Sequence, residues 1–313
     1  MEINRRPPAL YRKTIIPILL LFCVLTGCTF EARNHLILGT NYLKLGKIDH
    51  SIREFKKALV ADPKNVTALI RLGNAYEKKG LTDEAIAEYE KALKYSPNSA
   101  NAHASLGLAY ARKGMFDEAI AEYNKVIDIY PGLAEPYFMM GLAYGESGTL
   151  DKAIICFKKA TKIDPKYTEA YLYLGLAYDT KGDTEGAIRE FEKVLELRPH
   201  DAVASVSLAE TYMNKGVKYE QEGRLDEAIF NLQEALAINQ GLVEAHMLLG
   251  RIYQEKGMMQ EAISEYQQII SLNPEYADAH KEFAEALKTV GLYSMAERET
   301  EIYKNLTRSR NVK

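Results

Sequence analysis

The sequence predicts an all-α protein in which short helical hairpins stack as a solenoid. Three observations predict this fold. The pentapeptide L-G-L-A-Y starts at residues 106 and 174, and M-G-L-A-Y starts at 140, so the copies recur every 34 residues. Proline, glycine and alanine recur at the same interval along nearly the whole chain. Between these markers, apolar residues follow helical spacing.

The recurring residues predict where each helix ends. The prolines are Pro63, Pro97, Pro131, Pro165 and Pro199. The glycines are Gly46, Gly80, Gly114, Gly148 and Gly182, followed by Gly223, Gly257 and Gly291. A glycine suits the left-handed residue that follows the first helix of a hairpin. A proline ends the second helix because it cannot continue one.

This pattern resembles the tetratricopeptide repeat, W-x2-L-G-x2-Y…A-x3-F…P. In the third repeat the matching residues are His103, Leu106, Gly107 and Tyr110, then Ala119, Tyr123 and Pro131. About eight repeats are indicated, which begin near residues 32, 66, 100, 134, 168, 202, 243 and 277. The resemblance implies a right-handed solenoid of helix-turn-helix units with a concave groove.

Two departures from the pattern divide the array. The step from Gly182 to Gly223 is 41 residues, so helix A of the sixth repeat is lengthened by seven residues, nearly two turns. In the eighth repeat Ala284 stands where the pattern has glycine, and the polar second helix suits a solvent-facing cap. We therefore expect repeats 1–5 over 32–201, and repeats 6–8 with a C-terminal capping helix over 202–310.

The first 27 residues have the build of a signal peptide. Basic residues precede an uncharged run at 14–27, which is shorter than the roughly 20 residues that span a bilayer and contains Pro17. Residues 25–28, L-T-G-C, resemble the bacterial lipobox, in which the chain is cut before the cysteine. The resemblance implies lipid attachment, such as palmitate, at Cys28 and a lipidated tether at 28–31. The alternative is an uncleaved N-terminal anchor.

The residue after the cysteine bears on location. In Gram-negative relatives an aspartate there retains the lipoprotein at the inner membrane, and this chain has Thr29. The resemblance therefore implies a bacterial cell-envelope protein, held at the outer membrane and facing the periplasm if the source is Gram-negative.

Composition and motifs argue against several other functions. A net charge of −3 provides no basic face for nucleic acid. H-E-x-x-H, C-x-x-C, G-x-S-x-G and phosphate-loop motifs do not occur, so we expect no enzyme activity, no cofactor and no metal site. Four histidines take the fourth position of their repeats, which is a packing position, and Cys156 is expected to act as a small hydrophobe.

The resemblance also implies a partner-binding groove. In this family the second, fifth, ninth and twelfth residues of each first helix face the concave surface, and in repeats 3–5 the fifth and ninth residues are apolar. The groove residues are then Ala104, Leu108, Phe138, Leu142, Leu172 and Leu176. The alternative is that these side chains pack against their own neighbours. Some members bind a carboxyl terminus through lysine and asparagine, but here only Asn74 matches, beside Ile70 and Ser105, so this mode is not expected.

These observations predict a membrane-anchored scaffold that binds a partner protein, through an apolar peptide or helix segment, and assists assembly of a cell-envelope complex. Contact with the membrane is through the N-terminal lipid, and the sequence sets no oligomeric state. Two alternatives stay open. One is a structural or self-associating lipoprotein without a peptide ligand, and the other is an accessory subunit of an envelope enzyme.

Overall fold

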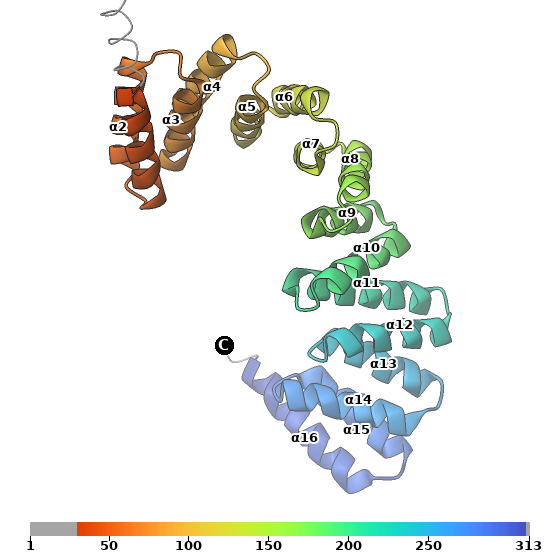
Figure 1. The fold of residues 1–313 in the computed structure, drawn as a ribbon. Coiled ribbons are helices and arrows are strands. Elements are labelled where there is room, and N and C mark those ends of the chain that lie inside the picture. Colours follow the sequence, from red (N-terminus) through yellow and green to blue (C-terminus); the bar gives the residue numbers. More distant parts are fainter. Residues whose placement is uncertain (1–29, 311–313) are drawn as a thin grey trace, which may run out of the picture. The chain divides into compact units, whose positions relative to one another are not determined.

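The computed structural model describes residues 30–310, and over this range the chain forms α-helices joined by short turns, without strands (Figure 1). The predicted signal peptide at 1–27 and Cys28 lie outside the described residues. Residues 30 and 31 of the predicted tether belong to the first described helix, at 30–44. None of the helices in the described range has the length and hydropathy that a membrane crossing requires. The predicted all-α solenoid of helix-turn-helix repeats is confirmed.

The described helices group into two compact units, which divide between Ile163 and Asp164. The N-terminal unit contains the helix at 30–44, α2 (Ile48–Ala61), α3 (Val66–Lys79), α4 (Thr82–Tyr95), α5 (Ala100–Arg112), α6 (Phe116–Ile129), α7 (Ala134–Glu146) and α8 (Leu150–Ile163). The C-terminal unit contains α9 (Thr168–Lys181), α10 (Thr184–Leu197), α11 (Ala202–Gln221), α12 (Leu225–Ile238), α13 (Val243–Glu255), α14 (Met259–Leu272), α15 (Ala277–Thr289) and α16 (Tyr293–Arg310). The division expected after residue 201 stays a prediction.

The turn inside each repeat depends on a glycine in the left-handed region. At the end of α3, Gly80 has a φ of 81°, and its N–H donates to the carbonyl of Glu77 at 3.0 Å. The next N–H, of Leu81, donates to the carbonyl of Tyr76 at 2.9 Å. These bonds satisfy carbonyls at the helix end, and a side chain at this φ would be strained. The predicted role of the turn glycines is confirmed, since all eight have positive φ.

A second glycine, inside each first helix, lets the hairpin close. A Cβ on Gly107 would lie 2.7 Å from a ring carbon of Tyr123, and a Cβ on Gly73 would lie 2.4 Å from one of Tyr89. Other repeats make the same contact through Gly39 and Phe55, Gly141 and Phe157, Gly175 and Phe191, and Gly250 and Tyr266. The paired helices therefore approach closely at these glycines, and a buried aromatic ring fills the space that each glycine leaves.

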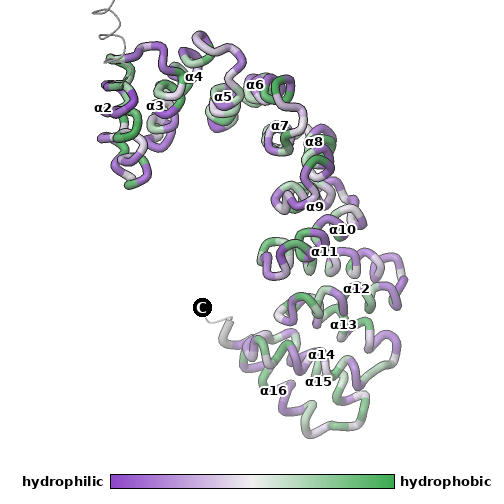
Figure 2. The backbone as a smooth tube through the Cα atoms, in the orientation of Figure 1, coloured by the Kyte–Doolittle hydropathy of each residue, from purple (hydrophilic) through white to green (hydrophobic). Residues whose placement is uncertain are grey.

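Stacking within each unit follows the order of the chain. Every helix from α2 to α8 packs against the next, and so does every helix from α9 to α16. The first helices of successive repeats also touch, as α3 does with α5 and α5 with α7. Hydrophobic residues recur along each helix between hydrophilic ones (Figure 2). The core therefore lies between helices, as several small clusters in the N-terminal unit and as a larger cluster from α12 to α16 in the C-terminal unit, because no single hairpin can bury its own apolar face.

The lengthened helix of the sixth repeat is also confirmed. Helix α11 has 20 residues, whereas α3 has 14 and α13 has 13. Asp201 caps its start by accepting from the N–H of Ala204 at 3.0 Å. The insertion extends α11 while it still packs against α12.

Candidate functional site

The predicted groove residues take positions of different exposure. Ala104 and Leu108 on α5 and Leu142 on α7 are half-buried. Phe138, also on α7, is only 8% exposed, and its ring centroid lies 5.8 Å from that of Phe157. Phe138 therefore contributes to packing between α7 and α8. Leu172 and Leu176 are half-buried on α9, in the C-terminal unit.

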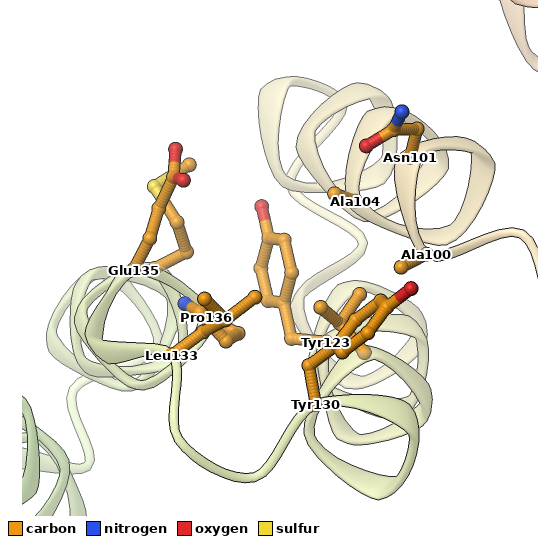
Figure 3. Close-up of a pocket in the computed structure, with 10 residues that line it drawn as sticks. Ala100, Asn101, Ala104, Tyr123, Tyr130, Leu133, Glu135 and Pro136 are labelled. Atoms are coloured by element: carbon orange, nitrogen blue, oxygen red, sulfur yellow. The ribbon is translucent and has the colours of Figure 1, made fainter.

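Two adjoining pockets lie on the N-terminal unit. The apolar pocket, of about 170 Å³, is lined by Ala100, Asn101, Ala104, Tyr123, Val126, Tyr130, Leu133, Glu135, Pro136 and Met139 (Figure 3). The polar pocket, of about 430 Å³, is lined by Thr67, Ile70, Arg71, Asn74, Asn101, Ala104, Ser105 and Glu135. Asn101, Ala104 and Glu135 line both. Of the predicted groove residues, Ala104 thus lies where the two pockets meet.

The phenol of Tyr123 is the buried polar group of the apolar pocket. Tyr123 is 1% exposed, and its hydroxyl has no hydrogen-bond partner among the described residues. Figure 3 shows the ring pointing between α5, which carries Ala104, and α7, which carries Glu135. Burial raises the pKa of Tyr123 to about 12, while the positive charge of Arg112 opposes this rise and the weaker influence of Glu135 adds to it, so the hydroxyl stays a proton donor. A buried donor without an acceptor costs about 1–3 kcal/mol.

The corresponding tyrosines of two other repeats do have acceptors. The hydroxyl of Tyr89 donates to Oδ1 of Asn74 at 2.6 Å, and the hydroxyl of Tyr266 donates to Oε1 of Gln254. Leu108 occupies in the third repeat the position that Asn74 occupies in the second, 34 residues earlier. The exchange of asparagine for leucine leaves the hydroxyl of Tyr123 without its internal acceptor.

Arg71 gives the polar pocket an unpaired positive charge. It is half-buried, and no ion pair or hydrogen bond is made by its side chain within residues 30–310. By contrast, Nη1 of Arg112 lies 2.5 Å from Oε2 of Glu77. Ile70, Asn74 and Ser105 do line the polar pocket together, as the repeat alignment implies, and Arg71 is the one cationic side chain among its lining residues.

The histidines at the fourth position of their repeats join helices within the repeat. Nδ1 of His103 lies 2.5 Å from Oε2 of Glu122 on α6, and Nε2 lies 2.8 Å from the carbonyl oxygen of Pro97. Corresponding histidine–glutamate pairs are His35 with Glu54, His246 with Glu265, and His280 with Glu299. These contacts account for the histidines as structural residues, and the described range contains no cluster of potential metal ligands.

Cys156 lies in the core of the N-terminal unit. It is 7% exposed, packs in a cluster with Tyr123 and Met140, and forms no disulfide. Burial raises the pKa of its thiol to about 11, so the reactive thiolate is scarce at neutral pH. The expectation of a small hydrophobic role is confirmed.

Sequence reasoning missed the two residues that distinguish this site, Tyr123 and Arg71. The repeat pattern identifies Tyr123 only as the aromatic residue of the second helix. A usable signal existed: Tyr89 and Tyr123 are the same residue in successive repeats, while Asn74 and Leu108 differ. Arg71 gave no signal, since one arginine on a helix is ordinarily solvated and only its position in the pocket sets it apart.

Comparisons with known proteins agree with the repeat architecture. A family model described as the cilia and flagella-associated protein 70 C-terminal domain matches residues 61–287, and a TPR repeat model matches residues 39–80. No match is found among curated proteins.

Several solved structures are similar. A crystal structure of MamA protein is 34% identical over 55% of this chain and 94% of that one, with a TM-score of 0.50. A second MamA structure, from Desulfovibrio magneticus RS-1, is 26% identical over 55% and 98% of the two chains, with a TM-score of 0.51. The C-terminal part of a TPR repeat-containing protein from Cytophaga hutchinsonii is 19% identical over 80% and 99%, with a TM-score of 0.64, and shows the fold alone.

Proposed function

This chain belongs to the tetratricopeptide-repeat family represented by the C-terminal domain of cilia and flagella-associated protein 70, and on that premise we propose that it is a scaffold that binds a partner polypeptide. The observation that carries the proposal is the pair of adjoining pockets on α3, α5, α6 and α7. They combine apolar walls with a few polar groups, which is the usual character of a binding site. The proposal gives the chain a binding role and no catalytic one.

We further propose that the scaffold is tethered to a bacterial envelope membrane through a lipid on Cys28. The support is the L-T-G-C sequence at 25–28, which directly precedes the helix at 30–44. A tether this short would hold the first repeat at the membrane surface. Two or more acyl chains anchor a protein stably, whereas one does so only marginally. The partner is then a component of an envelope assembly, at the periplasmic face of the outer membrane if the source is Gram-negative.

The binding role is tested by site-specific crosslinking in the native envelope. A photoreactive amino acid is placed at Asn101, which lines both pockets, and in a second chain at Met139, which lines the apolar pocket, and the products are identified by mass spectrometry. Both positions should yield a covalent adduct with the same partner polypeptide. Ile155, which is 66% exposed on α8, is the control position and should not yield it. Adducts that form equally at Ile155, or form at none of these positions, would remove the pockets as a binding site.

The anchor is tested separately, by growth with labelled palmitate. Label should enter the wild-type chain and be lost in Cys28→Ala, while Cys156→Ala, a change to a buried cysteine, should keep it. Label that persists in Cys28→Ala would overturn the lipid attachment and leave the binding role untouched.

A further inference from the structure

The hydroxyl of Tyr123 is not required for packing. Phe55, Phe157 and Phe191 take the same position in the first, fourth and fifth repeats, and each ring packs on its glycine without a hydroxyl. A phenylalanine at 123 would fill the same space and would not bury a donor that lacks an acceptor. The hydroxyl therefore suits a ligand that brings the acceptor with it.

The surroundings of the hydroxyl favour a neutral acceptor. The walls beside it are mainly apolar, and the charged lining residue, Glu135, is negative. The charges of Glu135 and Arg112 act on the hydroxyl in opposite directions, so they do not select an anion. A carboxylate would lose its hydration against the apolar walls, at a cost that the neutral carbonyl of a peptide main chain largely avoids. Main-chain carbonyls inside a helix are already hydrogen-bonded, so an extended segment is the kind that has carbonyls to offer.

The wall of the polar pocket that α3 provides carries Arg71 and favours an acidic group, whereas Glu135 belongs to the wall that α7 provides. The guanidinium of Arg71 lacks an anionic partner within the described chain, and half-burial makes such a charge more costly to leave unpaired. The Asn101 side chain, which lines both pockets, can accept from and donate to a main chain that passes from one to the other. Since the two pockets adjoin, one extended segment can occupy both.

We infer that the apolar pocket receives one apolar side chain of an extended partner segment, that the hydroxyl of Tyr123 donates to a main-chain carbonyl of this segment, and that Arg71 pairs with an acidic side chain of the same segment. This inference rests on the proposed function and adds the chemistry of the ligand. The segment recognised is internal, with an acidic residue near a large apolar one, and needs no free carboxyl terminus.

The test uses the full-length chain, purified in mild detergent, and a phage-displayed library of random linear peptides. Enriched sequences should share an acidic and a large apolar residue, and they are then synthesised with both ends capped and with a fluorescent label. By fluorescence anisotropy, Tyr123→Phe and Arg71→Gln should each weaken binding by about tenfold. Tyr266→Phe, which removes the corresponding hydroxyl in the C-terminal unit, should leave the affinity unchanged.

A second variant supplies the missing acceptor from inside. Leu108→Asn reproduces the Asn74 arrangement of the second repeat, so the hydroxyl of Tyr123 gains an internal partner and the capped peptide should bind more weakly. In Arg71→Gln, a peptide with its acidic residue changed to the amide should bind as well as the acidic one. Circular dichroism of all variants should keep the wild-type helical signal, which separates lost binding from lost fold.

The outcomes distinguish this inference from the proposed function. Peptides that bind Tyr123→Phe and Arg71→Gln as tightly as the wild type, but lose binding in Leu142→Glu, would overturn the inference and leave the scaffold role standing. A library that yields no enriched peptide would count against both. Competition by a synthetic peptide of residues 14–27, or a dimer in sedimentation that Tyr123→Phe abolishes, would assign the pockets to the chain's own segment or to a second copy and would also overturn it.

Discussion

The second and third repeats are built alike, yet only one of them satisfies its central tyrosine. Tyr89 packs on Gly73 and donates to Asn74, whereas Tyr123 packs on Gly107 and finds Leu108 instead. The contact that closes the hairpin is the same in both. The difference lies in one residue of the first helix. Asparagine accepts a hydrogen bond from the tyrosine hydroxyl, whereas leucine leaves that hydroxyl unpaired beside a pocket. The repeated residues therefore keep the packing the same, while single residues of the first helix can differ between repeats without changing that packing.

The largest expected effect concerns the glycine that both repeats need. Gly107→Ala should lower the free energy of unfolding by about 3 kcal/mol, because the new Cβ would overlap the buried ring of Tyr123. Urea unfolding followed by circular dichroism measures this change. Gly132→Ala is the control, since a Cβ there meets no atom within 4 Å. Equal stabilities of the two variants would contradict the close-packed hairpin.

A smaller difference should separate the glutamates of these repeats. Glu122 is hydrogen-bonded to the buried His103, whereas its equivalent Glu88 pairs with exposed Lys91. The second repeat has Leu69 at the position of His103. Glu122→Ala should cost about 2 kcal/mol, because a hydrogen bond to a charged group is lost at a buried imidazole. Glu88→Ala should cost less than about 1 kcal/mol. The same urea titration compares them, and a reversed order would show that the histidine contact contributes little.

Removal of the two tyrosine hydroxyls should affect the free energy of unfolding differently. Tyr89→Phe removes a hydrogen bond and leaves Asn74 without its donor, so the free energy of unfolding should fall by about 1 kcal/mol. Tyr123→Phe removes an unpaired donor, so stability should stay unchanged or rise slightly. Equilibrium unfolding of both chains gives the difference. A loss at Tyr123→Phe as large as that at Tyr89→Phe would mean that the hydroxyl of Tyr123 has a partner after all.

A further effect appears only at high pH. Tyr123 has a pKa of about 12 in the folded chain, raised by burial from its ordinary value of 10.0. The unfolded chain therefore releases this proton first, and the stability that protonated Tyr123 contributes is fully present below pH 10 and falls as the pH rises towards about 12. In urea titrations at increasing pH, Tyr123→Phe should lose less stability than the wild type. Parallel pH profiles would contradict the buried phenol.

Much of the fold could be predicted because one contact is made many times. The turn glycines, the glycine under each aromatic ring and the helix-ending prolines recur at a fixed interval, so each repeat supports the interpretation of the others. The seven-residue lengthening of α11 was predictable for the same reason, since it appears as a break in that interval. Such features depend on residues near one another in the chain, where spacing and conformation are closely linked.

The site was only partly predictable. Ala104 and Leu108 were expected on the inner side and lie on α5, where Ala104 lines both pockets, but Phe138, expected with them, packs against Phe157. Tyr123 looked like any other core aromatic, and Arg71 like any other surface charge. Whether a side chain finds a hydrogen-bond or ionic partner depends on neighbours from three different helices. The pattern of a single helix does not contain that information.

The sequence by itself determined the helical hairpin, its length, its turns and its repetition, because these follow from backbone conformation and from apolar spacing within about 34 residues. Only the tertiary structure decided that Tyr123 is buried beside a pocket without an acceptor and that Arg71 has no anion to pair with. The physical reason is that hydrogen-bond and ionic partners come from separate repeats, which only the fold brings together. Leu108 in place of the asparagine found at 74 removes the partner of one hydroxyl and leaves the fold unchanged.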